Sequence, residues 1–176
     1  FLTECSTARR AAARERAVKR TEAAAPAVSS PQSDFPIVGV GASAGGLDAF
    51  RKLLVALPAD TGMAFVLIQH LDPTHESMMV GLLAGHTAMS VMQASDGMPI
   101  ERNHVYLMPP RAYLAIRDGM LHLSVPRERQ GTRMPFDFFL NSLAETCNER
   151  AICAVLSGTG TDGSQGLKAI KQRGGL

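Results

Sequence analysis

One serine in the chain lies where a hydroxyl could attack a carbonyl carbon. The segment Gly41-Ala42-Ser43-Ala44-Gly45 fits the Gly-x-Ser-x-Gly pattern of a nucleophile elbow, in which small neighbours leave a serine exposed on a tight strand-to-helix turn. Unpaired N–H groups at the start of a following helix, and the positive end of its dipole, would stabilise an oxyanion formed there. Ser43 is therefore a candidate nucleophile.

Two other predicted strand ends carry groups that could assist this serine. His70 follows the apolar run 64–69, and Asp162 lies in a glycine-rich loop after the apolar run 151–156. The carboxyl ends of parallel strands meet in one crevice, where an imidazole would take the serine proton and a carboxylate would orient the imidazole. Each also has a plainer reading, since a histidine at a strand end is ordinary and an aspartate often caps the next helix, here the last one.

The same turn also fits a looser pattern, the dinucleotide fingerprint Gly39-x-Gly41-x-x-Ala44. That reading requires an acidic residue at the end of the next strand. The next strand ends in Gln69 and His70 instead, and the first carboxylate is Asp72. A phosphate-cradling turn in a nucleotide-binding domain stays open as a weaker alternative.

We expect neither a metal nor a cofactor. Asp72, His75 and Glu76 lie close together in the sequence, but they match no familiar ligand spacing. The cysteines are odd in number, and Cys147 and Cys153 fall inside apolar patterns, as small core residues would. They weakly indicate a reducing compartment.

Composition predicts a globular protein in the cytoplasm. The 176 residues are 45% hydrophobic, no apolar run approaches the roughly 20 residues of a membrane helix, and the first residues lack the organisation of a secretory signal. Residues 35–176 contain twelve Lys/Arg and twelve Asp/Glu, and the chain has two Tyr and no Trp. A nucleic-acid partner is not expected, because it would favour a basic face and stacking aromatics.

The chain divides into a tether and one domain. Residues 1–34 change from an Ala/Arg/Glu-rich stretch to a Pro/Ser-rich one, which predicts a disordered or partly helical tether. From Phe35 strands and helices alternate, so residues 35–176 predict an α/β fold: a three-layer αβα arrangement around a mainly parallel, doubly wound sheet. The last residues, Gly174 to Leu176, fall where a helix cap would lead into another strand, so we expect the domain to be incomplete at its C-terminus.

Spacing of apolar residues places the helices and an insert. Helical faces are predicted by Leu47, Phe50, Leu54 and Leu57; by Met78, Met79, Leu82 and Leu83; and by Phe136, Phe139, Leu140, Leu143 and Cys147, with a final helix over 164–173. Four short β-like runs between Ser90 and Val125, with a hairpin turn at Asp118-Gly119, predict an antiparallel insert on the parallel sheet.

Taken together, three segments resemble the catalytic domain of the chemotaxis protein-glutamate methylesterases, the CheB-type family. They are GVGASAGG at 39–46, IQHL at 68–71 and LSGTGTDG at 156–163. The order Ser, His, Asp agrees with that family, whereas an α/β-hydrolase would have the order Ser, Asp, His. The resemblance extends over residues 35–176.

This resemblance implies hydrolysis of γ-glutamyl methyl esters on the cytoplasmic helices of chemoreceptors in bacterial chemotaxis, with release of methanol. Some relatives also deamidate glutamine. By the same likeness Ser43 is the nucleophile, His70 the base and then the acid, and Asp162 the orienting carboxylate. The loops that would bind the oxyanion and the substrate contain Ala44, Gly45, Thr159 and Gly160.

The chain also departs from the family pattern. Ala44 stands where Thr is common and Thr159 where Met is common, and residues 1–34 predict a tether where the family usually has a receiver domain. These features resemble hybrid proteins that join a methylesterase-like domain to a methyltransferase and sensory domains. A weakly active or inactive regulatory or binding module of such a protein is therefore the alternative function, with a fused or separate methyltransferase as a partner.

Overall fold

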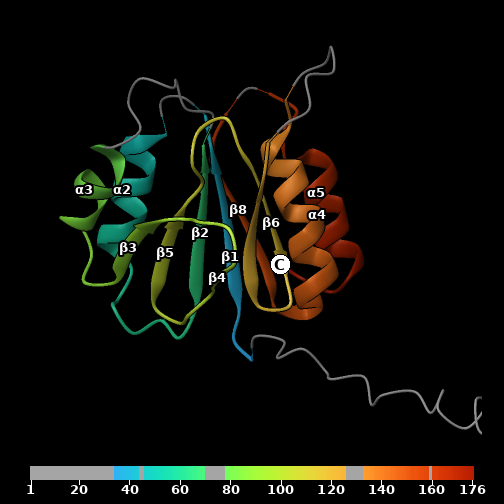
Figure 1. Ribbon diagram of the computed structural model, residues 1–176, viewed down its shortest axis with the longest axis horizontal. Coiled ribbons are helices and arrows are strands. Elements are labelled where there is room, and N and C mark those ends of the chain that lie inside the picture. The colour runs from blue at the N-terminus through green and yellow to red at the C-terminus, as the bar shows by residue number, and fades with distance from the viewer. Residues whose placement is uncertain (1–33, 44–45, 70–77, 126–132, 159) are drawn as a thin grey trace, which may run out of the picture.

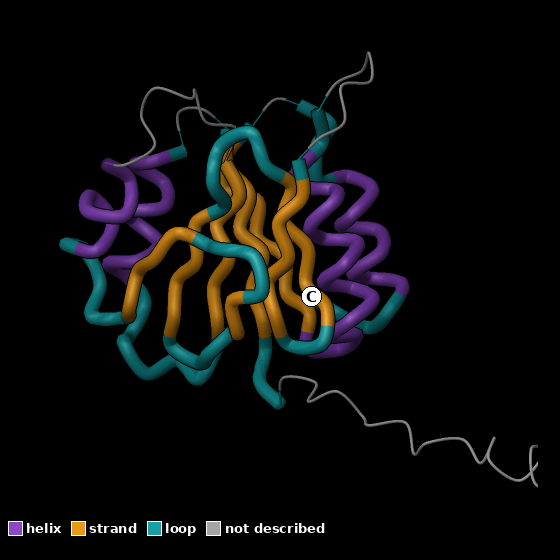
Figure 2. Tube along the Cα trace, viewed as in Figure 1, coloured by secondary structure: helices purple, strands orange, loops and turns teal. Residues whose placement is uncertain are grey.

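Five parallel strands form the central sheet of the protein, a computed structural model that describes residues 34–43, 46–69, 78–125, 133–158 and 160–176. The strand order is β3-β5-β2-β1-β8, with helices on both faces (Figures 1 and 2). The predicted three-layer α/β fold is confirmed. The strands are β1 (Ile37–Ala42), β2 (Ala64–Gln69), β3 (Ser90–Gln93), β5 (His104–Leu107) and β8 (Ala151–Ser157).

Strand β1 lies inside the sheet, and its alternating side chains are buried on both faces because helices cover both. Val38 and Val40 pack toward α2 (Leu47–Ala56) and α3 (Met78–Ala84). Ile37 packs on the opposite face, against a core that includes α4 (Pro135–Cys147) and Ile170 of α5 (Ser164–Gln172). Figure 1 shows these two helical pairs on either side of the sheet.

Two of the predicted helical faces are confirmed and one is half wrong. In α2, Phe50 and Leu54 are fully buried, and the five apolar residues predicted for α4 are all at most 4% exposed. In α3 only Met79 and Leu83 are buried, whereas Met78 is 62% exposed and Leu82 47% exposed. A helix of seven residues at the side of the sheet buries a single i, i+4 stripe, and the neighbouring stripe faces solvent.

The predicted antiparallel insert exists, but it is not part of the main sheet. It is a separate sheet of order β4-β7-β6, made of β4 (Met98–Pro99), β6 (Tyr113–Arg117) and β7 (Met120–Ser124). The other two runs, β3 and β5, instead join the main sheet in parallel. Asp118 and Gly119 both have positive φ, as the predicted hairpin requires. The small sheet packs its apolar residues into the core beside α4.

The strand order opens a crevice between β1 and β8. These strands are neighbours, yet the helices that follow them, α2 and α5, lie on opposite faces of the sheet. Such a topological switch point separates the two following loops and leaves a depression at the carboxyl ends of the strands, at the top of Figure 1. A short 3-10 helix, η1 (Asn148–Arg150), connects α4 to β8.

Glycines let α4 approach the sheet closely. A Cβ at Gly39 would lie 2.9 Å from carbons of Leu140 and Phe139, and a Cβ at Gly41 would overlap the ring of Phe136. A Cβ at Gly166 of α5 would likewise overlap the Leu140 side chain. The layer formed by α4 and α5 therefore depends on positions that have no side chain.

Both described cysteines lie in apolar surroundings, as the sequence predicted. Cys147 of α4 is 2% exposed, and Cys153 of β8 is half-buried and packs against the same core. Burial, with a smaller contribution from the charge of Asp137, raises the pKa of the Cys153 thiol to about 11. Within the described ranges, the helices are too short or too polar to span a lipid bilayer.

Gly166→Ala should lower the free energy of unfolding by about 1–3 kcal/mol, because the new methyl group overpacks against Leu140. Gly81→Ala is the matched control, since it is also in a helix but has no atom within 4 Å of the added Cβ. That change should raise stability by about 0.5–1 kcal/mol. Urea unfolding followed by circular dichroism measures both, and equal effects of the two substitutions would contradict the close packing.

The Cys153 thiol should resist alkylation in the folded protein. A thiol with a pKa of about 11 is ionised at pH 8 in roughly one molecule in a thousand, and the thiolate is the reactive form. Iodoacetamide treatment with peptide-resolved mass spectrometry should leave Cys153 unmodified in buffer and modified in denaturing urea. Rapid labelling in buffer would show that the thiol is more accessible or more acidic than its packing implies.

Candidate active site

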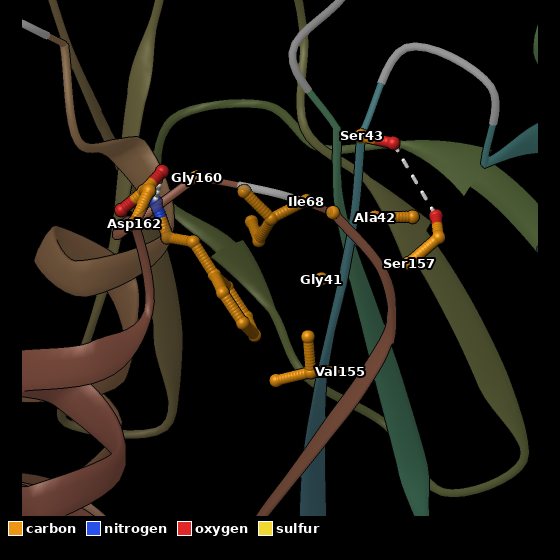
Figure 3. Close-up of a pocket in the computed structure, with 10 residues that line it drawn as sticks. Gly41, Ala42, Ser43, Ile68, Val155, Ser157, Gly160 and Asp162 are labelled. Carbon is orange, nitrogen blue, oxygen red and sulfur yellow. Dashed lines mark hydrogen bonds between the residues drawn. The ribbon is translucent and has the colours of Figure 1, made fainter.

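A pocket of about 220 Å³ lies at the carboxyl ends of β1 and β8. Ser43, which follows β1, and Asp162, which lies in the loop before α5, both line it, as does Gly160 (Figure 3). Two of the residues predicted from separate parts of the sequence therefore share one cavity. The remaining lining residues are Gly41, Ala42, Ile68, Phe136, Val155, Ser157 and Gly158.

The backbone of Ser43 is held from three directions. Its N–H donates to the carbonyl of Ser157 at 3.1 Å, which extends the pairing of β1 with β8. Its carbonyl accepts from Gly46 N at 2.8 Å and from the Gln69 side-chain amide at 3.1 Å. The serine therefore sits at a well-defined point between two neighbouring strand ends.

The Ser43 hydroxyl is half-buried and lies 3.4 Å from the hydroxyl oxygen of Ser157. Figure 3 shows this pair at one side of the pocket and Asp162 at the other. A contact of this length is weak, so the hydroxyl can rotate toward a base. The pocket interior lies between the hydroxyl and the carboxylate.

The tight turn after Ser43 depends on Gly46 and not on strain at the serine. A Cβ on Gly46 would overlap that of Ala42, so this position accepts no side chain. Among the non-glycine residues that the structure describes, left-handed backbone occurs at Asn103, Arg111, Asp118 and Asn148, and Ser43 is not one of them. The turn resembles a nucleophile elbow in sequence but lacks this form of backbone strain at the serine.

Asp162 binds the start of α4. Its carboxylate accepts hydrogen bonds from Phe136 N at 3.1 Å and from Asp137 N at 2.9 Å, both in the first turn of that helix. The sequence offers Asp162 as a possible cap of the last helix. Asp162 does cap a helix, but that helix is α4 and not α5. The N–H groups and the dipole of α4 offset the negative charge of the carboxylate and keep it at the pocket wall.

Several predicted site residues lie outside the described residues. They are His70, Ala44, Gly45 and Thr159, and also Asp72, His75 and Glu76 of the metal alternative. His70 directly follows Gln69, whose partner in the parallel register is Ala42, the residue before Ser43. In the part of the chain that is described, no three His, Cys, Asp or Glu residues are grouped so that they could hold a metal ion.

The packing argues against the dinucleotide reading of the glycine pattern. In that motif the second glycine leaves room for a pyrophosphate, but at Gly41 the space is filled by the Phe136 ring. Gly39 lies within β1 and faces α4. The described residues that line the pocket also include no lysine or arginine to pair with a phosphate. These glycines serve helix packing.

Sequence reasoning missed two residues that touch Ser43. Ser157 is the last residue of β8 and pairs with Ala42, so its position beside Ser43 follows from strand register, which the sequence alone does not reveal. Gln69 is 4% exposed and binds the Ser43 carbonyl. A polar residue at the end of an otherwise apolar strand was the available signal for Gln69.

Comparisons with known proteins agree with this geometry. The family model described as CheB methylesterase matches residues 38–176. A protein-glutamate methylesterase/protein-glutamine glutaminase of Bordetella avium is 35% identical over 149 residues, covering 84% of this chain and 44% of the relative. One of Burkholderia orbicola is 36% identical over 157 residues, covering 88% of this chain and 46% of the relative.

The fold comparison leads to the same family. The crystal structure of the Thermotoga maritima CheB methylesterase catalytic domain superimposes with a TM-score of 0.74 at 27% identity, covering 81% of this chain and 77% of that one. This chain spans less than half the length of the Bordetella and Burkholderia relatives. Family model, curated relatives and fold all coincide, and the chain belongs to the CheB methylesterase family.

Proposed function

We propose that this chain is a serine hydrolase that removes methyl groups from glutamate methyl esters in proteins, with Ser43, His70 and Asp162 as its catalytic residues. The observation that carries the proposal is that Ser43 and Asp162, 119 positions apart by their numbers, line one pocket at the switch point of the sheet. Membership of the CheB methylesterase family, and the names of the relatives as protein-glutamate methylesterases, support the reaction type.

The first half of the proposed reaction forms an acyl-enzyme. His70 accepts the Ser43 proton as the serine oxygen attacks the ester carbonyl carbon, giving a tetrahedral oxyanion. His70 then protonates the leaving methoxide, and methanol departs while the glutamyl group stays bonded to Ser43. Asp162, held at the α4 N-terminus, orients the imidazole and stabilises its positive charge.

The second half regenerates the serine. A water molecule gives a proton to His70 and attacks the acyl carbon, which forms a second tetrahedral intermediate. The bond between that carbon and the Ser43 oxygen then breaks, His70 returns the proton to the Ser43 oxygen, and the product leaves as a glutamate side chain. A glutamine side chain would react in the same way, with ammonia in place of methanol, which matches the double name of the relatives. The oxyanion donors proposed for both steps are backbone N–H groups of the loops that contain Ala44, Gly45, Thr159 and Gly160.

The pocket suits an uncharged ester better than its product. Ile68, Phe136 and Val155 provide an apolar lining, and Asp162 contributes a negative charge. A methyl ester enters such a site without losing the hydration of a charge, whereas the carboxylate product is repelled by Asp162. This difference favours product release.

We place the substrate on the cytoplasmic helices of methylated chemoreceptors, as expected for a CheB-type methylesterase, and the reaction in the cytoplasm. A methyltransferase, fused to this chain or separate, would supply the methyl ester. We further propose that residues 35–176 act as the catalytic domain and that residues 1–34 tether it.

Ser43→Ala should abolish methanol release from a methylated chemoreceptor fragment, since no other atom in the proposal forms the acyl-enzyme. The expected loss in kcat is about 10³-fold or more. Ser124→Ala, at an exposed position of β7, is the matched serine control and should retain wild-type kcat. Gas chromatography of the released methanol provides the measurement.

A serine-directed fluorophosphonate probe separates the two functions considered for this chain. An active hydrolase labels at Ser43 in wild type and in Ser124→Ala, but not in Ser43→Ala. No labelling, together with equal background methanol release from wild type and Ser43→Ala, would overturn the hydrolase and leave the regulatory or binding module.

A further inference from the structure

A second aspartate, Asp137, contacts Asp162, because the Asp137 backbone N–H donates to the Asp162 carboxylate. Asp137, in the first turn of α4, is only 5% exposed, and its Oδ1 accepts a hydrogen bond from Gly166 N of α5 at 2.7 Å. The other oxygen, Oδ2, is buried without a hydrogen-bond partner among the described residues. Buried aspartates are rare, because the charge loses its hydration.

Asp137 and Asp162 bind reciprocally. Asp162, just before α5, binds amides at the start of α4, and Asp137, at the start of α4, binds an amide at the start of α5. The hydrogen bond from Gly166 N to Asp137 Oδ1 is short at 2.7 Å. The starts of α4 and α5 are therefore held together by two carboxylates, Asp162 bound to α4 and Asp137 bound to α5.

Asp162 is linked to α5 by a single residue, so the position of the α5 start determines the position of Asp162 in the pocket. Gly163, which joins them, has φ +99°, and a Cβ there would lie 2.6 Å from the Phe136 ring. Gly163 therefore lies too close to the Phe136 ring of α4 to carry a side chain. A displacement of the α5 start would move Asp162 directly, because only Gly163 separates it from that helix.

We propose that Asp137 is a positioning residue that sets the direction of the Asp162 carboxylate by tying the start of α5 to the start of α4. This inference rests on the proposed role of Asp162 in catalysis. Asp137 lies outside the residues that line the pocket, so it acts through Asp162 and not on the substrate. In the proposed reaction Asp162 orients the His70 imidazole, so a misplaced Asp162 carboxylate would leave that imidazole poorly oriented.

Asp137→Ala should lower kcat for methanol release by about 10- to 100-fold with KM within a factor of about two, since it misplaces a catalytic group without touching the substrate. Asp137→Asn, which keeps an oxygen for Gly166 N, should restore kcat to within about threefold of wild type. Unchanged kcat in Asp137→Ala, or a loss in Asp137→Asn as large as in Asp137→Ala, would overturn the proposal.

Ser142→Ala is the control for general damage to α4. Ser142 also links α4 to its surroundings, accepting from Ile116 N at 3.0 Å and donating to the Phe139 carbonyl at 2.7 Å, but it makes no contact with Asp162. This variant should unfold more easily than wild type and keep its kcat. If Ser142→Ala lost as much kcat as Asp137→Ala, the loss would come from reduced stability of α4, and the proposal that Asp137 positions Asp162 would be rejected.

A readout that does not need activity keeps this test separate from that of the reaction. The Phe136 amide proton, which donates to Asp162, should shift in the NMR spectrum of Asp162→Ala, and should shift in the same direction in Asp137→Ala but not in Ser142→Ala. An unmoved Phe136 amide in Asp137→Ala would refute the tie. If wild type releases no methanol while the Phe136 amide shifts as expected, the proposed hydrolase function is wrong, but the link from Asp137 to Asp162 is supported.

Discussion

The close contact between α4 and β1 is the constraint on which the site depends. Two glycines on one face of β1 leave room for the Phe136 ring and for the residues one turn further along α4. This brings the start of α4, whose first N–H groups have no partner within the helix and bind Asp162 instead, to the edge of the sheet where β1 and β8 end. Side chains at Gly39 or Gly41 would push α4 away from the strand ends, and the pocket would lose its wall.

Negative charge is placed at helix starts, where backbone dipoles can offset it. Asp162 accepts two amides of α4, and Asp137 accepts one of α5, so neither carboxylate needs a lysine or arginine beside it for these contacts. Among the described residues that line the pocket, the carboxylate is thus accommodated without a lysine or arginine.

The serine is positioned by the backbone in a similar way. Its N–H and carbonyl are bound to Ser157, Gly46 and Gln69, which belong to or adjoin three different elements. Among the described residues, the Ser43 hydroxyl has only the long contact of 3.4 Å with the Ser157 hydroxyl. The Ser43 main chain is thus held in place while its hydroxyl can rotate, an arrangement that suits the proposed role of Ser43 as a nucleophile.

The sequence by itself determined the alternation of strands and helices, the buried face of α4 and the hairpin at Asp118-Gly119, because apolar spacing and turn chemistry act over a few residues. It also indicated Ser43 and Asp162, since parallel strands collect their carboxyl ends on one edge. Tertiary structure alone decided that β3 and β5 join the main sheet, and that Asp162 caps α4 and not the last helix. It likewise decided that Ser157 faces the serine and that Gly41 accommodates a ring and not a phosphate. These outcomes depend on strand register and on the packing of residues far apart in the chain, which local sequence patterns do not encode.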